Sequence, residues 1–315
     1  MAETLGVALC RRLDVHALYA ETIAERAPEL RLTRPGDAAP EEMAFALCFE
    51  PPDDAFTFYP NLRLISSIAA GVDAILACPS RPPSVPVIRM RDHGQARRMA
   101  GFALWHVVHW HRRMDRLLVN QAAERWDRAA SDMTPPEDVG VGILGFGLLG
   151  RALAQALTPL GYAVRSHART TPEPEPGVSH FHGEEGLAPF LAGSDILVNL
   201  LPNTPATRNI LSAALFEALP NGARVINLGR GAQLAEADLL SALASGRLAG
   251  ASLDVFAEEP LPKDHPFWRH PQVVVTPHVA ADVTRGIVPE TLRAALAAID
   301  SGARPQTEVD PAAGY

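Results

Sequence analysis

One glycine-rich stretch near the middle of the chain constrains the fold more than any other feature. Residues 139–150 read VGVGILGFGLLG, a short apolar run that is followed by a helical pattern. In this arrangement a buried strand turns abruptly into a helix, whose N-terminal amides and positive dipole end attract phosphate groups. A second apolar run, residues 162–166, arrives at the expected distance. The stretch therefore predicts a dinucleotide-binding fingerprint in a parallel α/β sheet.

The glycines of the fingerprint have separate tasks. Gly145 can take the tight turn, Gly147 lets the backbone approach a pyrophosphate, and Gly150 lets the helix pack against the strand. The intervening residues of the turn belong to the same candidate cofactor site. The predicted contacts are Gly145, Phe146, Gly147, Leu148, Leu149 and Gly150.

Length and composition exclude several classes of protein. A chain of 315 residues suits two domains, and 47% hydrophobic with 20% charged residues is typical of a globular protein. The formal net charge of -8 makes nucleic acid and anionic membranes poor partners. Neither a signal peptide nor a bilayer-spanning run is recognised, so we expect a cytoplasmic protein. Cys10, Cys48 and Cys78 lack C-x-x-C spacing and are expected to be reduced packing residues.

Short apolar runs alternate with helical patterns on both sides of the fingerprint. Before residue 98 they predict a small α/β domain, with strands at 5–9, 43–49, 62–68 and 85–90 and a helix at 15–26. After the fingerprint, strands at 195–200, 223–227 and 248–253 complete a doubly wound sheet. A terminal amphipathic helix is predicted over 284–301.

A largely apolar helix is predicted over residues 95–118, followed by a second helical stretch over 117–126. It has apolar residues on too many sides for an exposed helix, so we expect it to be buried between domains or subunits. His106, His109 and His111 lie on it without a carboxylate at a matching spacing. They are interpreted as packing or interface residues, and no metal site is predicted.

The end of the second strand of the nucleotide domain indicates the cofactor. An NAD site usually has an acidic residue there, whereas this chain has Ser166-His167-Ala168-Arg169-Thr170. Arg169 can pair with a 2′-phosphate, and Ser166, His167 or Thr170 can donate to it. We therefore expect NADP (as NADPH) to be preferred. Arg169 as a merely solvated loop residue, with NAD as the cofactor, is the alternative.

Three titratable or charged residues directly follow successive strands of this sheet. They are Arg230, Glu259 and His278, and parallel strands bring such positions to a common edge. An arginine can hold the carboxylate and carbonyl of a 2-oxoacid, a histidine can deliver a proton, and a carboxylate can orient the imidazole. Together they favour a hydride-transfer site over three unrelated surface groups.

The chain resembles the D-isomer-specific 2-hydroxyacid dehydrogenase family, and most closely its branch of glyoxylate/hydroxypyruvate reductases of the A type. The resemblance covers almost the whole length. Besides the fingerprint, it rests on Ala70–Asp73, Leu200–Arg208, Asn227–Gly231, Leu253–Pro262, Thr276–Ala280 and the ending Gly314-Tyr315.

The resemblance implies that Arg230 binds substrate and that Glu259 and His278 form the acid/base pair. It implies that the amides of Ala70, Gly71 and Val72 hold the substrate carboxylate. Asp254 and the Leu228 carbonyl would orient the nicotinamide. Further implied contacts are Phe49 with substrate and Leu201, Pro202, Thr207, Leu228, Gly229, Arg230, Asp254 and His278 with cofactor.

The implied architecture is a Rossmann dinucleotide-binding domain, residues 99–283, inserted in a smaller flavodoxin-like α/β substrate domain, residues 1–98 and 284–315. The active site would lie in the cleft, and a homodimer would form through the helices around 101–126. The implied partner is a small 2-oxoacid such as glyoxylate or hydroxypyruvate.

Two departures from the family pattern keep other interpretations open. Gly101 stands where the wider family has a glutamate, and Phe49 where this branch has a tryptophan. A dehydrogenase for a bulkier 2-oxoacid is therefore one alternative. A nucleotide-sensing interaction protein on the same fold is the other, although such a sensor would not need all of Arg230, Glu259 and His278.

Overall fold

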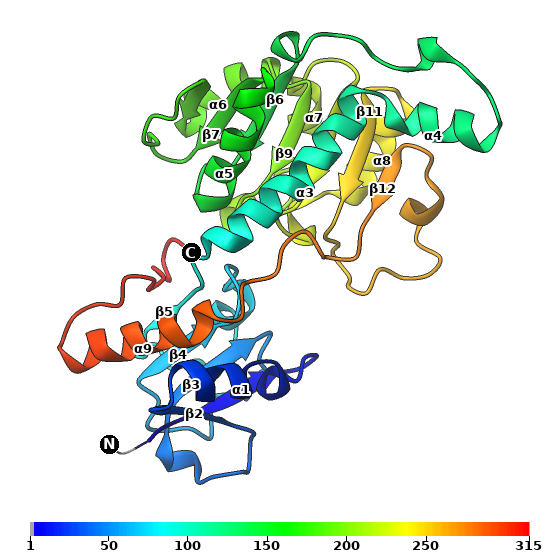
Figure 1. Cartoon of the computed structure of the whole chain (residues 1–315). Coiled ribbons are helices and arrows are strands. Elements are labelled where there is room, and N and C mark those ends of the chain that lie inside the picture. The colour runs from blue at the N-terminus through cyan, green and yellow to red at the C-terminus, as the bar shows by residue number, and fades with distance from the viewer. Residues whose placement is uncertain (1–2, 315) are drawn as a thin grey trace. The chain divides into compact units, whose positions relative to one another are not determined.

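The computed structural model describes residues 3–314, so Tyr315 of the matched ending lies outside the described residues. The chain divides into two compact units, drawn in Figure 1. The first comprises the residues up to Gly94 and those from Asp282 on, and the second comprises Gln95–Ala281. The predicted domain boundaries, after residues 98 and 283, lie a few residues further along the chain than those after Gly94 and Ala281. The boundary after Gly94 falls inside a helix that begins at His93.

A parallel sheet of five strands forms the centre of the first unit in residues 3–94 and 282–314. Its order, β2-β1-β3-β4-β5, is that of flavodoxin-like folds. The strands are β1 (Thr4–Cys10), β2 (Leu30–Thr33), β3 (Met43–Phe49), β4 (Leu64–Ser67) and β5 (Val87–Ile88). The helices are α1 (Val15–Arg26), α2 (Asp73–Leu76) and α9 (Ile287–Asp300). Because α9 packs against α1, the end of the chain belongs to this unit.

The second unit is built on a parallel sheet of order β12-β11-β10-β9-β6-β7-β8. The strands are β6 (Gly140–Leu144), β7 (Ala163–Ala168), β8 (Val178–His182), β9 (Ile196–Asn199), β10 (Ala223–Asn227), β11 (Leu248–Leu253) and β12 (Val273–Val275). The helices are α3 (His93–His111), α4 (Met114–Ala122), α5 (Leu148–Leu157), α6 (Gly183–Ala192), α7 (Ala213–Ala218) and α8 (Glu236–Ala244).

The strand order reverses beside β6, because β7 lies on one side of it and β9 on the other. Side chains alternate between the two faces of the sheet, each of which has its own core. In β10, Ile226 packs in the core that includes α3 and α5, whereas Val225 packs in the core with α6, α7 and α8. Helices thus cover both faces, and the predicted doubly wound fold is confirmed (Figure 1).

Several predicted elements are confirmed to the residue, among them the helix 15–26 and the strands 43–49, 223–227 and 248–253. The strands β2 and β8 were not predicted. Both lie at a sheet edge, and β8 shows partly exposed residues along its whole length, so neither reads as a buried apolar run. Within residues 3–314, no helix is both long and apolar enough to span a membrane.

The predicted long helix over 95–118 is wrong, because the chain breaks it after His111. Arg113 has a left-handed backbone with φ 56° and precedes the new helix α4. Its guanidinium donates to both carboxylate oxygens of Asp115, at 3.0 and 2.8 Å. This pairing stabilises the turn, and α4 then ends at Ala122, short of the predicted Trp126.

Candidate active site

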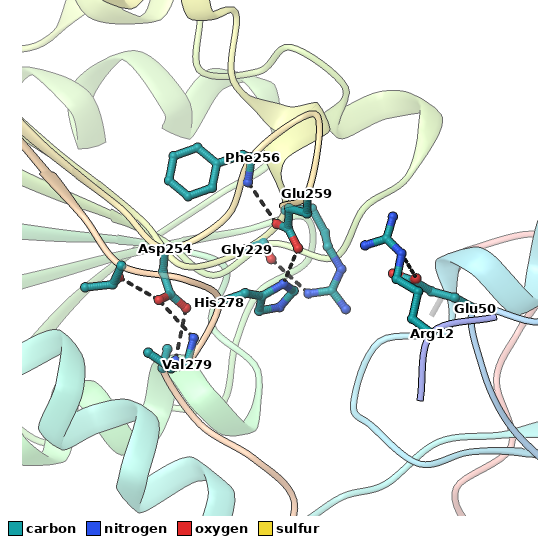
Figure 2. Close-up of polar contacts among 11 residues, drawn as sticks. Arg12, Glu50, Gly229, Asp254, Phe256, Glu259, His278 and Val279 are labelled. Atoms are coloured by element: carbon teal, nitrogen blue, oxygen red, sulfur yellow. Dashed lines mark hydrogen bonds and ion pairs between the residues drawn. The ribbon is translucent and has the colours of Figure 1, made fainter. Parts of the chain in front are cut away.

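Three neighbouring strands of the second unit deliver the candidate catalytic residues. Arg230 follows β10, Glu259 follows β11 and His278 follows β12, and these strands lie next to one another in the sheet. Because all are parallel, their carboxyl ends share one edge. Figure 2 shows the side chains of Glu259 and His278 pointing toward each other there.

Glu259 and His278 form a hydrogen-bonded pair. The distance from His278 Nδ1 to Glu259 Oε2 is 2.8 Å, and Glu259 Oε1 accepts a bond of 2.9 Å from the Phe256 N–H. The His278 backbone is left-handed, with φ 55°, and its N–H donates to the Asp254 carbonyl at 2.8 Å. Since Nδ1 is used by the carboxylate, Nε2 is the ring nitrogen left to face a reacting group.

The pair also sets the charge of both groups. The hydrogen bond that His278 donates to Glu259 raises the pKa of His278 above its usual value, although burial and Arg230 oppose this. Burial acts to raise the pKa of Glu259, but hydrogen bonds from His278 and Phe256 outweigh it and bring that pKa below its usual value. The arrangement favours an imidazolium beside a carboxylate, which is the protonated form that a proton donor needs.

Arg230 lies in a turn that a buried polar network holds. Its N–H donates to Gln233 Oε1 at 2.8 Å, and its own Nη1 donates to the Gly229 carbonyl at 2.8 Å. Gln233 also accepts from Asn199 Nδ2 at 2.8 Å and donates to the carbonyls of Leu201 and Pro202. Gln233 thus ties the arginine turn to the turn after β9.

This network was missed in the sequence. Asn199 and Asn227 are fully buried at the last positions of their strands, and Asn199 Nδ2 donates to Asn227 Oδ1 at 2.9 Å. A polar residue that ends an otherwise apolar strand is the signal that could have found them. Gln233 gives no such local signal, because Asn199, Leu201 and Pro202, with which it bonds, lie more than 30 residues earlier in the chain.

Gly231 is enclosed by backbone atoms, which leave no room for a side chain at this position. A Cβ there would lie 1.8 Å from the Phe256 carbonyl carbon and 2.4 Å from the Ala257 nitrogen. Gly231→Ala is expected to lower the free energy of unfolding by about 1–3 kcal/mol or more, because the backbone must shift. Gly101→Ala is the matched control, since a Cβ on Gly101 meets nothing within 4 Å. Equal denaturation midpoints for the two variants would contradict this account.

Asp254 anchors the segment that carries His278. It is 1% exposed, and its carboxylate accepts from Thr276 Oγ1 at 2.6 Å and from the N–H groups of Val279 and Ala280 at 3.1 and 3.0 Å. Figure 2 shows the carboxylate turned toward Val279. These bonds make Asp254 a structural support of the His278 turn, while its contact with a nicotinamide stays a prediction.

The glycine-rich turn lies where the sheet order reverses, after β6, and its shape suits a dinucleotide. Gly145 has φ +100°, and a Cβ on Gly150 would lie 2.2 Å from the Gly145 carbonyl oxygen, so both positions need glycine. A Cβ on Gly147 would meet nothing within 4 Å, so its free side is open to an approaching phosphate. The first amides of α5 have no partner within the helix and can donate to that phosphate.

The turn after β9 carries three further predicted cofactor contacts, Leu201, Pro202 and Thr207. Thr207 Oγ1 donates to the Pro202 carbonyl at 2.7 Å and accepts from the Thr204 N–H at 2.9 Å. The bonds from Gln233 to Leu201 and Pro202 hold the same turn. It is therefore a rigid neighbour of the glycine-rich turn, to which it is bonded through Leu200 N–H and the Leu144 carbonyl at 2.8 Å.

At the end of β7, Ser166 does not lie where a donor to a 2′-phosphate was expected. Ser166 is fully buried, and its Oγ lies 2.7 Å from His180 Nδ1, so its hydroxyl faces the interior. The expected donation from Ser166 to a 2′-phosphate does not fit this position. His167 Nε2 lies 2.9 Å from the Gly183 carbonyl oxygen, whereas Arg169 is exposed. Arg169 is thus the best placed of these candidates.

In the first unit, the predicted carboxylate-binding loop follows β4. Ser67 Oγ donates to the Gly71 carbonyl at 2.8 Å and accepts from the Ala69 N–H at 3.0 Å, which folds the loop on itself. Ala70 and Gly71 remain partly exposed, while Val72 is buried. Ser67 was not singled out in the sequence, although a hydroxyl at a strand end is a common loop organiser.

Phe49 ends β3, the strand beside β4, and is half-buried. The next residue, Glu50, has φ 46° and pairs with Arg12, with 3.3 Å between Arg12 Nε and Glu50 Oε2. Figure 2 includes this ion pair. It secures the chain just beyond Phe49.

The histidines of α3 pack in the interior. His106 and His109 are 1% and 4% exposed, and their rings contact Phe102 and Trp105. Burial lowers the pKa of His106 to about 4. Among residues 3–314, no three side chains of His, Cys, Asp or Glu are grouped as metal ligands would be.

Comparison with known proteins places this site in a family. The sequence model of the D-isomer specific 2-hydroxyacid dehydrogenase, NAD binding domain, matches residues 104–280. The glyoxylate/hydroxypyruvate reductase A of Serratia proteamaculans is 42% identical over 300 residues, which cover 93% of this chain and 94% of that protein. The one from Photorhabdus laumondii is 39% identical, with 95% and 96% covered.

Solved structures agree over the full length. A D-isomer specific 2-hydroxyacid dehydrogenase from Xanthobacter autotrophicus, in complex with NADPH and MES, has a TM-score of 0.92 and 37% identity, with 100% of both chains covered. An NADPH-dependent glyoxylate/hydroxypyruvate reductase from Sinorhizobium meliloti, with NADP and sulfate, has a TM-score of 0.90 and 32% identity, covering 99% of this chain and 100% of that one. The fold is that of an NAD(P)-dependent dehydrogenase, and this chain is an enzyme of that class. This chain belongs to the D-isomer-specific 2-hydroxyacid dehydrogenase family.

Proposed function

We propose that this protein is an NADPH-preferring reductase of small 2-oxoacids, such as glyoxylate and hydroxypyruvate, that forms D-2-hydroxyacids. The observation that carries the proposal is the His278–Glu259 pair, which lies beyond the same sheet edge as Arg230 in a fold with a dinucleotide fingerprint. The names of the similar reductases from Serratia and Photorhabdus support the substrate class.

The side chains divide the work of the reduction. When bound, a reduced nicotinamide would supply the hydride that the carbonyl carbon of the oxoacid accepts. Arg230 binds the carboxylate and carbonyl oxygens through its planar fork of N–H donors. His278 donates the proton from Nε2 to the carbonyl oxygen as negative charge develops there. Glu259 holds the ring through Nδ1 and stabilises the imidazolium before the transfer.

Further parts of the proposal concern the first unit. The amides of Ala70, Gly71 and Val72 are proposed to bind the substrate carboxylate, since the loop that Ser67 folds leaves the first two partly exposed. Phe49 is proposed to contact the organic part of the substrate. This unit would then be the substrate domain.

Cofactor preference depends on Arg169. Residues 166–170 contain no carboxylate to repel a 2′-phosphate, and Arg169 is exposed at the end of β7. The similar proteins from Xanthobacter and Sinorhizobium were solved with NADPH and NADP. Initial rates with NADPH and NADH, each crossed with glyoxylate, hydroxypyruvate, pyruvate and a phenyl-substituted 2-oxoacid, test the proposal. A preference for NADH would contradict the cofactor assignment, and activity on the bulky acid alone would contradict the substrate assignment.

The paired residues predict a pH effect. As a proton donor, His278 is active below its pKa, and reduction is lost as pH rises through that value. Glu259→Gln removes the carboxylate that raises this pKa, so the alkaline limb of kcat/KM for reduction is expected to shift to lower pH. Glu258→Gln alters the exposed neighbour and should leave the limb in place. An unmoved limb in Glu259→Gln would refute the assigned role of the carboxylate.

A homodimer and a cytoplasmic location also remain proposals. Large apolar side chains are exposed on α3, on α4 and in the loop after α4, as a contact surface between subunits would require. They are Trp105, Leu118, Val119, Trp126 and Met133. Light scattering on the purified protein gives the mass in solution, and a monomer would contradict the dimer.

A further inference from the structure

The loop that carries Arg169, residues 169–177 between β7 and β8, is bonded to its surroundings mainly through Glu175. Glu175 Oε2 accepts a hydrogen bond of 2.6 Å from Arg151 Nη1, and Glu175 Oε1 accepts one of 3.0 Å from Gln155 Nε2. Arg151 and Gln155 belong to α5, the helix that follows the glycine-rich turn. One carboxylate therefore ties the far end of the loop to the helix that faces the cofactor phosphates.

The backbone of Glu175 makes a second anchor. Its N–H donates to His180 Nε2 at 3.1 Å, so that nitrogen is an acceptor and the ring proton lies on Nδ1. Nδ1 then donates to Ser166 Oγ at 2.7 Å. Because Ser166 is fully buried in β7, this chain of bonds links the loop to the strand from which it starts.

The same group of side chains reaches the fingerprint itself. The guanidinium carbon of Arg151 lies 5.3 Å from the centre of the Phe146 ring, and the rings of Phe146 and His180 are 5.0 Å apart at an angle of 66°. Phe146 stands between Gly145 and Gly147. The loop, α5 and the glycine-rich turn thus contact one another through Glu175, Arg151 and Phe146.

We propose that Glu175 is a positioning residue for the NADPH 2′-phosphate, because its two anchors hold the loop in the conformation that presents Arg169. This inference rests on the NADPH preference proposed above. The loop contains Pro172, Pro174 and Pro176, which stiffen it but make no hydrogen bonds through nitrogen. With the loop already ordered, little conformational entropy is lost when a phosphate binds.

The direction in which removal of Glu175 changes phosphate binding distinguishes a positioning role from simple charge repulsion. Glu175 is negative, and hydrogen bonds from Gln155 and Arg151 hold its pKa below the usual value. If it acted only through its charge, its removal would tighten binding of a phosphate. If it acts as an anchor, its removal loosens the loop and weakens that binding.

Calorimetric titration with adenosine 2′,5′-bisphosphate and with 5′-AMP tests the inference without turnover, since the two ligands differ only in the 2′-phosphate. Glu175→Ala is expected to raise the Kd of the bisphosphate by about 3- to 10-fold and to leave that of 5′-AMP unchanged. Glu173→Ala is the matched control, because this exposed glutamate of the same loop bonds Arg151 only through its backbone carbonyl. Thermal denaturation of each variant checks that it is folded.

Arg169→Ala separates the two proposals. If Arg169→Ala weakens the bisphosphate while Glu175→Ala leaves it unchanged or tightens it, the role of Glu175 is overturned and the cofactor preference stands. If Arg169→Ala has no effect and the wild type binds NADH better than NADPH, the preference fails, and the inference fails with it. A rise in KM for NADPH but not for NADH in Glu175→Ala would support the inference independently.

Discussion

Replacing His278 with alanine is expected to lower kcat for 2-oxoacid reduction by about 10²–10⁴-fold, the usual contribution of a positioned general acid. Its ring is the group that Glu259 holds at 2.8 Å, and Glu259 cannot replace it as the acid because the pKa of that carboxyl lies below its usual value. Steady-state rates with saturating NADPH and hydroxypyruvate measure the loss. NADPH binding, followed by fluorescence, should be retained.

A second histidine in the same unit supplies a matched control. His265 Nε2 lies 3.2 Å from Glu236 Oε2, so it too forms a histidine–glutamate pair, and its ring packs against Phe267. His265→Ala removes a comparable pair that includes none of Arg230, Glu259 and His278, and it should leave kcat within about a few-fold of the wild type. Similar turnover in His278→Ala and the wild type would disprove the role of His278 as acid.

Arg230→Ala is expected to lower kcat/KM for the oxoacid by about 10²–10³-fold, because a hydrogen-bonded charge that loses its partner costs about 2–5 kcal/mol. Arg230→Lys keeps the charge but lacks the planar fork, so it should recover only part of the loss. The KM for NADPH should change far less than the KM for the oxoacid.

The exposed Arg269, in the short turn before β12, is a control for the loss of one positive charge. Arg269→Ala should behave as the wild type. If Arg230→Lys were fully active, the fork geometry would be irrelevant, and the substrate contact assigned to Arg230 would need to be reassigned.

Local patterns explain which parts of the fold were predictable. The strands 223–227 and 248–253 are buried on both faces, so each reads as an apolar run whatever surrounds it. The glycine-rich turn is equally local, because its tight turn and close helix contact each require glycine. The break at Arg113 has no such local signal. There the backbone is left-handed, with φ 56°, and the guanidinium pairs with Asp115.

The candidate site likewise has residues that the sequence could predict and residues that it could not. Arg230, Glu259 and His278 could be proposed from the sequence because parallel strands carry the residues that follow them to one edge of the sheet. This inference needs no knowledge of side-chain contacts. Gln233 and the burial of Ser166 depend on partners that are distant in the chain, namely Asn199 and His180. Hydrogen-bond networks of this kind arise from tertiary packing, so the spacing of residues in the sequence does not predict them.

The most direct test of the central claim combines one reaction with one product analysis. The purified protein is mixed with NADPH and hydroxypyruvate, the loss of reduced-nicotinamide absorbance is followed, and the glycerate formed is resolved on a chiral column. The account predicts one D-glycerate for each NADPH oxidised, with a slower reaction when NADH replaces NADPH. Binding of NADPH without oxidation by any small 2-oxoacid, or formation of L-glycerate, would contradict it.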